Sequence, residues 1–401
     1  MYLTREEEKI YDGERGEALQ KAIRAIVKVG EALGADRLIP IQHAHVSGIS
    51  YYNIGEAGYK FIKYLYTSSV KTVVYSTLNP LGMDLDKWEE LGINKDFASK
   101  QTELVNMLLG MGFEKSFTCT PYLLRQPKFR EHLAWSESSA VGMANTYYGA
   151  YTNREAGPLA LFSSLIGKTY NGGLHLIENR KPTVKVLLKE IEKDFVINEG
   201  VASAVGYIIG EKIGDGIPLI PLRLQPTFDV VKAYTAAAGA AGSIALSYLE
   251  NVSPEYSLYA NENLEKIEID IREIKDILVD ALPTLNENDA YFIGCPHASV
   301  EEIINLYNNI HDCKKLKTNI VVSTSRMVYE AIEKMGIKEK LLNLGVVIIR
   351  DTCPIVSPAF QKRFEKVITS SGKALFYLPK QQSQPTILLK NINLRDILCR
   401  E

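Results

Sequence analysis

The sequence has few of the features that mark specialised proteins. Only 5 of its 401 residues are cysteine, no Cys-x-x-Cys pair occurs, and 46 Lys and Arg balance 48 Asp and Glu to a net charge of −2. So few cysteines exclude a disulfide-built scaffold, and the balanced charge argues against a nucleic-acid partner, because a phosphate backbone is bound by an excess of cations. The content of 46% hydrophobic and 23% charged residues excludes a disordered chain.

The sequence also shows no pattern typical of a targeting signal or a membrane span. The charged residues 5–9 follow the first four residues directly, where a signal peptide would be apolar. The most hydrophobic stretch, 233–249, contains serines and tyrosines and is too short to span a bilayer comfortably. We therefore expect a cytoplasmic protein with reduced cysteines and with neither nucleic-acid nor membrane partners.

Short apolar runs alternate with amphipathic segments and with loops that contain Gly or Pro. This order predicts an α/β fold with largely parallel sheets, because parallel strands need crossover connections between them. Polar stretches separate the candidate units, and none of these stretches is a long linker. We expect three closely packed α/β subdomains at 1–115, 116–285 and 286–401.

Three of the five cysteines share one sequence context. Cys119, Cys295 and Cys353 each follow an apolar, strand-like run and precede a proline by one or two positions. Because proline ends a strand, and ligand sites of open α/β sheets lie beyond the carboxyl ends of strands, the three thiols are predicted to meet in one cleft. Cys313 lies at a charged helix end and Cys399 near the C-terminus, so neither has this context.

The cysteine pattern alone leaves zinc, an iron–sulfur cluster and three inert, buried thiols open. The separations of 176 and 58 residues fit no local zinc or ferredoxin motif. If a metal is present, iron–sulfur suits the chemistry best, because a cubane held by three thiolates keeps one iron open as a Lewis acid for a leaving hydroxyl. Such a site suits the dehydration of a 3-hydroxy acid.

Several long motifs resemble the aconitase X family over essentially the whole chain. They are HVSGISY (45–51), AWSESSA (134–140), Asn145, TNREAGPL (152–159), GCPH (294–297) and DTCP (351–354). The resemblance implies an aconitase-like fold with α/β/α subdomains around a central Fe–S cleft, and a hydro-lyase activity. It makes Cys119, Cys295 and Cys353 the ligands of an iron–sulfur cluster of the 4Fe–4S type.

Two branches of this family imply different substrates. Members of one branch are single chains that dehydrate cis-3-hydroxyproline and carry an extra swivelling domain, for which 401 residues leave no evident room. The other branch is split, and resemblance to its large subunit implies conversion of (R)-5-phosphomevalonate to trans-anhydromevalonate 5-phosphate and water, in the archaeal mevalonate pathway to isoprenoids. A small swivelling-domain subunit would then complete a heterodimer, or a dimer of heterodimers, and bring the catalytic serine. A hydroxyproline or other hydroxy-acid dehydratase and a non-catalytic iron–sulfur sensor are the alternatives.

The same motifs indicate which residues contact the substrate. Gly48, Ile49 and Ser50 form a turn of small residues before a helix, which suits an anion. Asn79 and Pro80 follow a strand and can face a cleft.

Charged and hydroxyl groups complete the predicted site. Glu137 and Ser138 are assigned substrate binding and catalysis, with the carboxylate orienting the leaving hydroxyl or relaying a proton. Ser138 or Ser139 could instead only cap the helix that follows. Lys373, in a short loop before a strand-like run, would bring a positive charge to a phosphate or carboxylate. Arg154 and Glu155 are expected to form an ion pair that supports the cleft.

Overall fold

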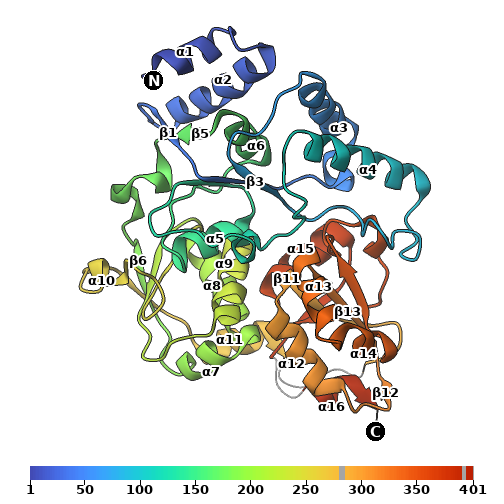
Figure 1. Cartoon of the computed structure of the whole chain (residues 1–401). Coiled ribbons are helices and arrows are strands. Elements are labelled where there is room, and N and C mark those ends of the chain that lie inside the picture. The colour runs from blue at the N-terminus through green and yellow to red at the C-terminus, as the bar shows by residue number, and fades with distance from the viewer. Residues whose placement is uncertain (280–284, 391–393, 401) are drawn as a thin grey trace.

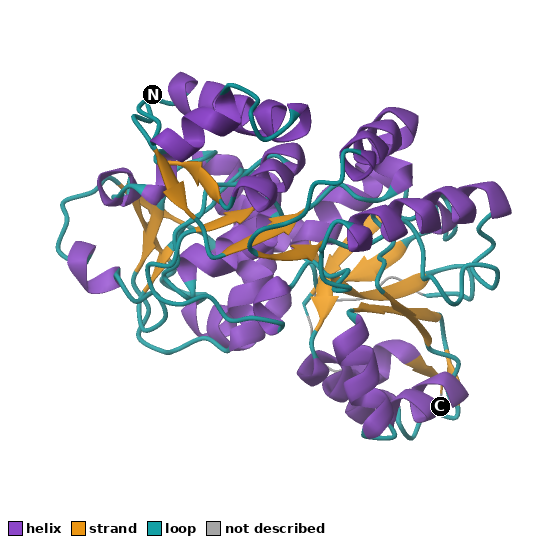
Figure 2. Ribbon diagram, turned by 45° about the horizontal axis from the view of Figure 1, so that its top comes forward, coloured by secondary structure: helices purple, strands orange, loops and turns teal. Residues whose placement is uncertain are grey.

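The computed structural model describes residues 1–279, 285–390 and 394–400. Three groups of strands and helices follow one another along the sequence, and the two ends of the chain lie at opposite ends of the molecule (Figure 1). All strand pairs in the three larger sheets are parallel, as predicted, whereas two small two-stranded sheets are antiparallel. Helices pack around the strands (Figure 2).

The first group contains a three-stranded sheet in the order β3-β2-β4. Its strands are β2 (His43–Val46), β3 (Tyr75–Leu78) and β4 (Leu133–Trp135), and a separate antiparallel pair joins β1 (Leu38–Pro40) to β5 (Lys168–Tyr170). The helices of this group are α1 (Arg5–Tyr11), α2 (Glu17–Ala32), α3 (Tyr51–Thr67), α4 (Lys95–Gly110), η1 (Pro121–Leu123), α5 (Ser138–Thr146) and α6 (Gly157–Ile166).

The second group contains a four-stranded sheet in the order β8-β7-β6-β9. Its strands are β6 (Val184–Leu187), β7 (Pro218–Ile220), β8 (Tyr248–Leu249) and β9 (Lys266–Glu268). The helices are η2 (Gly173–His175), η3 (Ile177–Arg180), α7 (Glu192–Ile197), α8 (Glu199–Ile213), α9 (Phe228–Ala241), α10 (Tyr256–Tyr259) and α11 (Ile271–Ile277). No helix in the described part of the chain is long and apolar enough to cross a bilayer.

The third group contains a six-stranded sheet in the order β10-β16-β15-β11-β13-β14. Its strands are β10 (Leu278–Val279), β11 (Ala290–Ala298), β13 (Asn319–Thr324), β14 (Val347–Arg350), β15 (Val367–Thr369) and β16 (Thr386–Leu389), and β12 (Lys315–Leu316) pairs with β17 (Cys399–Arg400). The helices are α12 (Val300–Ile310), α13 (Arg326–Lys334), α14 (Ile337–Asn343), η4 (Pro358–Phe360), α15 (Gly372–Gln382) and α16 (Leu394–Leu398).

A shared apolar cluster joins the first and third groups. It combines Met83 and Leu91, which follow β3, with Phe292 of β11 and Ile349 of β14. The main chains also meet, because the N–H of Leu81 donates to the carbonyl of Asp351 at 2.8 Å. The carboxyl ends of strands from two sheets are thereby held facing each other.

Helices α8 and α9 pack closely because glycine stands at their contact. A Cβ atom on Gly206 of α8 would come within 2.4 Å of the carbonyl oxygen of Tyr234 on α9. Most of both helices is buried, and small residues let the two backbones approach.

We predict that Gly206→Ala destabilises the protein by about 1–3 kcal/mol, the usual cost of overpacking a tight core. Glu211→Ala, an exposed position on the same helix, should change stability by less than about 0.5 kcal/mol. Denaturant unfolding of both variants measures the difference, and equal stabilities would contradict this close packing.

Candidate active site

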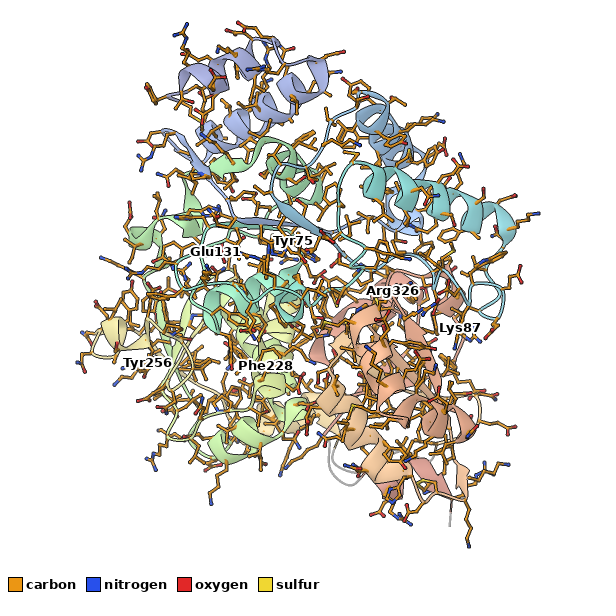
Figure 3. All side chains as sticks on the ribbon, viewed as in Figure 1. Tyr75, Lys87, Glu131, Phe228, Tyr256 and Arg326 are labelled. Carbon is orange, nitrogen blue, oxygen red and sulfur yellow. A yellow bond between two sulfur atoms is a disulfide. The ribbon has the colours of Figure 1, made fainter. Side chains whose placement is uncertain are left out.

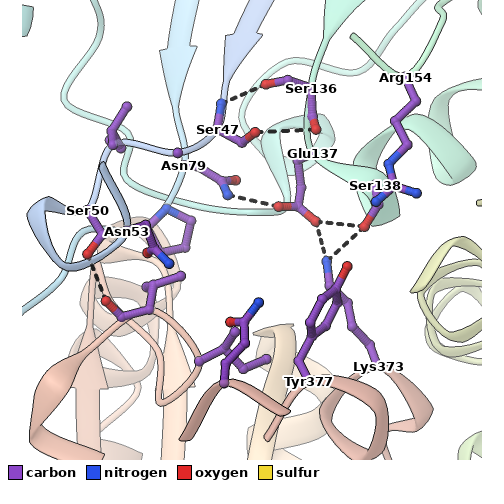
Figure 4. A pocket seen from close by; sticks show the side chains of 16 residues that line it. Ser47, Ser50, Asn53, Asn79, Ser136, Glu137, Ser138, Arg154, Lys373 and Tyr377 are labelled. Atoms are coloured by element: carbon purple, nitrogen blue, oxygen red, sulfur yellow. Dashed lines mark hydrogen bonds and ion pairs between the residues drawn. The ribbon is translucent and has the colours of Figure 1, made fainter. Parts of the chain in front are cut away.

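A polar cavity of about 260 Å³ lies where the loops after β2, β3 and β4 meet α15 (Figure 4). All eight residues predicted to bind substrate or to act in catalysis line it: Gly48, Ile49, Ser50, Asn79, Pro80, Glu137, Ser138 and Lys373. The other lining residues are Ser47, Asn53, Ser136, Arg154, Ile355, Val356, Tyr377 and Gln381. The distant loops meet because the carboxyl ends of parallel strands open at one edge of their sheet.

Three helices direct their N-terminal ends toward this cavity. Ser50 is the N-cap of α3 and Glu137 the N-cap of α5, and Lys373 lies in the first turn of α15. A helix N-terminus carries a partial positive charge and N–H groups without intrahelical partners. The cavity therefore favours an anionic ligand.

Glu137 and Lys373 form a buried ion pair in the cavity, with Nζ of Lys373 donating to Oε1 of Glu137. Nδ2 of Asn79 donates to Oε2 of the same carboxylate at 2.8 Å, and the Ser139 hydroxyl donates to Oε1 at 3.1 Å. Burial alone would raise the pKa of Glu137, but Lys373 and Asn79 outweigh burial and lower this pKa to about 2. Burial likewise would lower the pKa of Lys373, and the Glu137 charge raises it instead. Both groups are ionised at neutral pH.

A chain of buried hydrogen bonds supports Glu137 from behind. Because the amide nitrogen of Asn79 donates to Glu137, its Oδ1 must accept, and the partner at 3.0 Å is Nε2 of His45. Nδ1 of His45 then accepts from the Thr77 hydroxyl at 2.8 Å. Burial lowers the pKa of His45 to about 4, so the ring is neutral and in the Nε2–H tautomer. This series of hydrogen bonds fixes the orientation of the Asn79 amide, so that its nitrogen and not its oxygen meets Glu137.

The three candidate ligand cysteines, Cys119, Cys295 and Cys353, are free and buried. Burial raises the pKa of Cys119 to about 12 and that of Cys353 to about 11, and it raises the pKa of Cys295 well above the ordinary value. The charges of the other two sulfurs, of Glu137 and of Lys373 also act on Cys295. Contacts of His297, two residues after Cys295, bring the three thiols into one region: its N–H meets Cys119 Sγ at 3.1 Å, and its Nε2 lies 3.1 Å from the carbonyl of Thr352, next to Cys353.

The chemistry of three cysteine side chains suits the ligands of an iron–sulfur cluster. In the described residues, no three His, Cys, Asp or Glu side chains gather closely enough to hold one metal ion. In an iron–sulfur cluster the thiolates bond different irons, so they stand farther apart than the ligands of one ion. The Sγ of Cys119 accepts a hydrogen bond from the backbone N–H of His297 at 3.1 Å, as thiolate ligands of clusters do.

The loop before Cys353 is held by an ion pair from the neighbouring helix. Arg326, labelled in Figure 3, begins α13 and donates to Asp351 at 2.5 Å. Asp351 has a left-handed backbone with φ 62°, which turns the chain sharply after β14. Arg326 thus supports a cysteine loop and does not line the cavity.

The remaining two cysteines differ from expectation. Cys313 and Cys399 form a disulfide, so the prediction that all five thiols are reduced is wrong for this pair. Antiparallel pairing of β12 with β17 brings the two cysteines together. The Cα atoms of Cys313 and Cys399 are 5.3 Å apart, a usual separation for a disulfide.

Some local predictions around the site are also wrong. The segment 111–118 directly before Cys119 contains no strand, and Cys295 lies within β11, so of the three cysteines only Cys353 comes shortly after a strand, as expected. The run after Lys373 is helix α15, because Ser371 caps the N–H of Ala374 and starts a helix. The cap of α5 is Glu137, which accepts from the N–H of Ser139, and not Ser138.

Several residues that line the cavity were not predicted from the sequence. Three of them lie one or two helical turns after predicted site residues, so helical periodicity identifies them. Tyr377 and Gln381 lie four and eight positions after Lys373 on α15, so all three occupy one face of the helix. Asn53 lies three positions after Ser50 in the first turn of α3. Reading the segment after Lys373 as a strand concealed the first two.

Comparisons with known proteins agree on one relationship. Family models described as aconitase X first, second and third domain match residues 1–178, 182–279 and 288–394. The crystal structure of Thermococcus kodakaraensis aconitase X in its holo-form has a TM-score of 0.88 and 38% identity, covering 98% of each chain.

Named relatives fall into two kinds of dehydratase. The phosphomevalonate dehydratase large subunits of Methanocaldococcus jannaschii and Aeropyrum pernix are 42% and 41% identical, over 94% and 95% of this chain and 95% and 96% of their own length. The cis-3-hydroxy-L-proline dehydratase of Hypocrea jecorina is 30% identical over 94% of this chain but only 65% of that protein.

The fold is aconitase-like and the named relatives are dehydratases, so the chain is a hydro-lyase. Within that class, the chain belongs to the aconitase X family. The predicted fold class, family and enzyme class are confirmed.

We predict that Glu137→Gln and Lys373→Met each destabilise the protein by about 3–5 kcal/mol, because each leaves a buried charge without its partner. The double variant should lose clearly less than the sum of the two single losses. Denaturant unfolding of the four proteins gives this coupling energy. Additive losses would contradict an ion pair at this position.

Proposed function

We propose that this chain is the large, catalytic subunit of a phosphomevalonate dehydratase, which converts (R)-5-phosphomevalonate to trans-anhydromevalonate 5-phosphate and water. The observation that carries the proposal is the cavity, in which three helix N-termini favour an anion beside three free thiols. Relatives with this name match over nearly their whole length, whereas the hydroxyproline dehydratases extend well beyond the match. The reaction would belong to the cytoplasmic mevalonate route to isoprenoids.

Cys119, Cys295 and Cys353 would hold an iron–sulfur cluster of the 4Fe–4S type. When bound, such a cluster supplies a Lewis acid that polarises the departing hydroxyl of the substrate. The protein must remove the thiol protons to bind it, since burial keeps all three thiols protonated.

Glu137 is the residue proposed to meet the reacting hydroxyl. Its carboxylate is ionised and held at both oxygens, so it can accept a hydrogen bond from the hydroxyl without changing position. Nζ of Lys373 lies 3.3 Å from the Ser138 hydroxyl, which itself donates toward Glu137 at 3.4 Å. Ser138 can therefore pass a proton between this pair and the leaving oxygen.

The anionic ends of the substrate are proposed to bind at the helix N-termini. The turn of Gly48, Ile49 and Ser50 presents backbone groups at the start of α3, and Gly48 has the left-handed φ of 72° that such a turn requires. Asn79 and Pro80 also line the cavity, and Asn79 contacts Glu137.

A small subunit is proposed to complete the site as a heterodimer. The relatives' name, large subunit, implies such a partner. We assign to that partner the base, a serine, that removes the proton next to the carboxylate. The residues of this chain then orient the hydroxyl and hold the anions.

The proposal predicts turnover of 5-phosphomevalonate when the chain is co-expressed anaerobically with a candidate small subunit. Glu137→Gln, assayed in the same complex, should lower kcat about 100-fold or more, because it removes a group acting on the leaving hydroxyl. Turnover of hydroxyproline alone would favour the hydroxyproline dehydratase. A complex with a full cluster that turns over neither substrate would favour a sensor.

The ligand assignment predicts that Cys353→Ala loses the brown absorbance of the cluster and its iron. Cys313→Ala, which removes a cysteine of the distant disulfide, should keep both. Absorption spectra and iron analysis of the anaerobically purified proteins measure this. Full iron content in Cys353→Ala would refute the assignment.

A further inference from the structure

We propose that Arg154 binds the phosphate group of the substrate, an inference that rests on the function proposed above. The motif around Arg154 predicted an ion pair with Glu155 and only a supporting role. The structure places the two side chains differently, because the segment is extended and pairs with β4 at Trp135, so successive side chains point apart. Glu155 is buried and accepts from Thr169, whereas Arg154 is exposed and lines the cavity.

The guanidinium of Arg154 is anchored at one nitrogen only. Its Nη1 donates to the carbonyl of Gly239 at 2.9 Å and to the hydroxyl of Ser243 at 3.2 Å. Among the described residues, none accepts a hydrogen bond from its Nε or Nη2, and no carboxylate pairs with it. Arg154 thus has a fixed direction and a free pair of donors, and Figure 4 shows it extending toward Ser138.

Among the described residues that line the cavity, Arg154 is the one cation whose charge no carboxylate balances. The charged side chains that line the cavity are Glu137, Lys373 and Arg154, and the first two neutralise each other. A substrate with a carboxylate and a phosphate is strongly anionic. A planar guanidinium with two free N–H groups matches two phosphate oxygens at once.

The positions along the cavity decide which anion meets Arg154. Ser371, two residues before Lys373, donates its hydroxyl to the carbonyl of Cys295, so the pair of Glu137 and Lys373 lies on the thiol side of the cavity. The hydroxyl that leaves must meet that side, and in 5-phosphomevalonate the carboxylate is close to this hydroxyl while the phosphate ends the opposite arm. The phosphate therefore lies farther from the thiols than the leaving hydroxyl does, and we assign it to Arg154, the exposed arginine that lines the cavity.

The test uses the complex with the small subunit and compares wild type with Arg154→Gln and Arg154→Lys. For 5-phosphomevalonate, Arg154→Gln should raise KM about 10- to 100-fold while kcat changes less than about threefold, because a charged hydrogen bond made in both ground and transition state is lost. Arg154→Lys should recover part of the loss. The inhibition constant of mevalonate, which lacks the phosphate, should not change.

Two results would overturn this assignment. One is an unchanged KM in Arg154→Gln, and the other is an equal rise in the inhibition constant of mevalonate, which would mean that Arg154 holds the carboxylate. Arg272→Gln serves as the matched control, since this exposed arginine pairs with Asp270 and does not line the cavity. Ser243→Ala removes one anchor of the guanidinium without altering charge, and it should raise KM more weakly than Arg154→Gln.

Binding of inorganic phosphate separates the inference from the proposed function. Titration calorimetry on the same complexes should show phosphate binding that Arg154→Gln weakens by a similar factor. If wild type fails to turn over 5-phosphomevalonate yet binds phosphate through Arg154, the proposed function fails and the anion site stands. If phosphate binding is the same in both proteins, the site itself is refuted.

Discussion

The buried ion pair between Glu137 and Lys373 is the contact on which the site depends. Glu137 follows β4 in the first group of elements and Lys373 begins α15 in the third, so the pair joins two sheets across the cavity. A buried charge without a partner is costly, so each residue holds the other's segment in place. The hydrogen bonds from Asn79 and, behind it, His45 extend this support into β3 and β2.

The same pair sets the electrostatic character of the cavity. Because Glu137 and Lys373 cancel, the remaining positive potential comes from three helix N-termini and from Arg154. The Glu137 carboxylate can thus remain ionised next to an anionic substrate. Without this positive potential, repulsion between the carboxylate and the substrate would favour the protonated form of Glu137. Cys295 and Cys353 belong to the apolar cluster that joins the first and third groups, and burial raises the pKa values of all three thiols.

Predictions from the sequence were correct for the class of fold and for the residues that line the cavity. They were less reliable for individual helices and strands. The alternation of apolar runs and helices predicted parallel sheets, and the motifs singled out eight residues that line one cavity. The sequence indicated the wrong element after Lys373, because Ala374–Leu378 is apolar enough for a strand and periodicity in so short a run is ambiguous. It also missed the disulfide, since Cys313 and Cys399 are 86 positions apart and only strand pairing brings them together.

By itself, the sequence determined which residue types are available for the proposed chemistry: three cysteines before prolines, a glutamate, a lysine and turns of small residues. Their types and motifs are local properties that can be read along the chain. Only the tertiary structure decided their pairing, because the partner of Glu137 lies 236 positions away and neighbouring Arg154 and Glu155 point to opposite sides of their segment. Which charges cancel and which remain free is a property of the packed sheets, and it decides where an anion can bind.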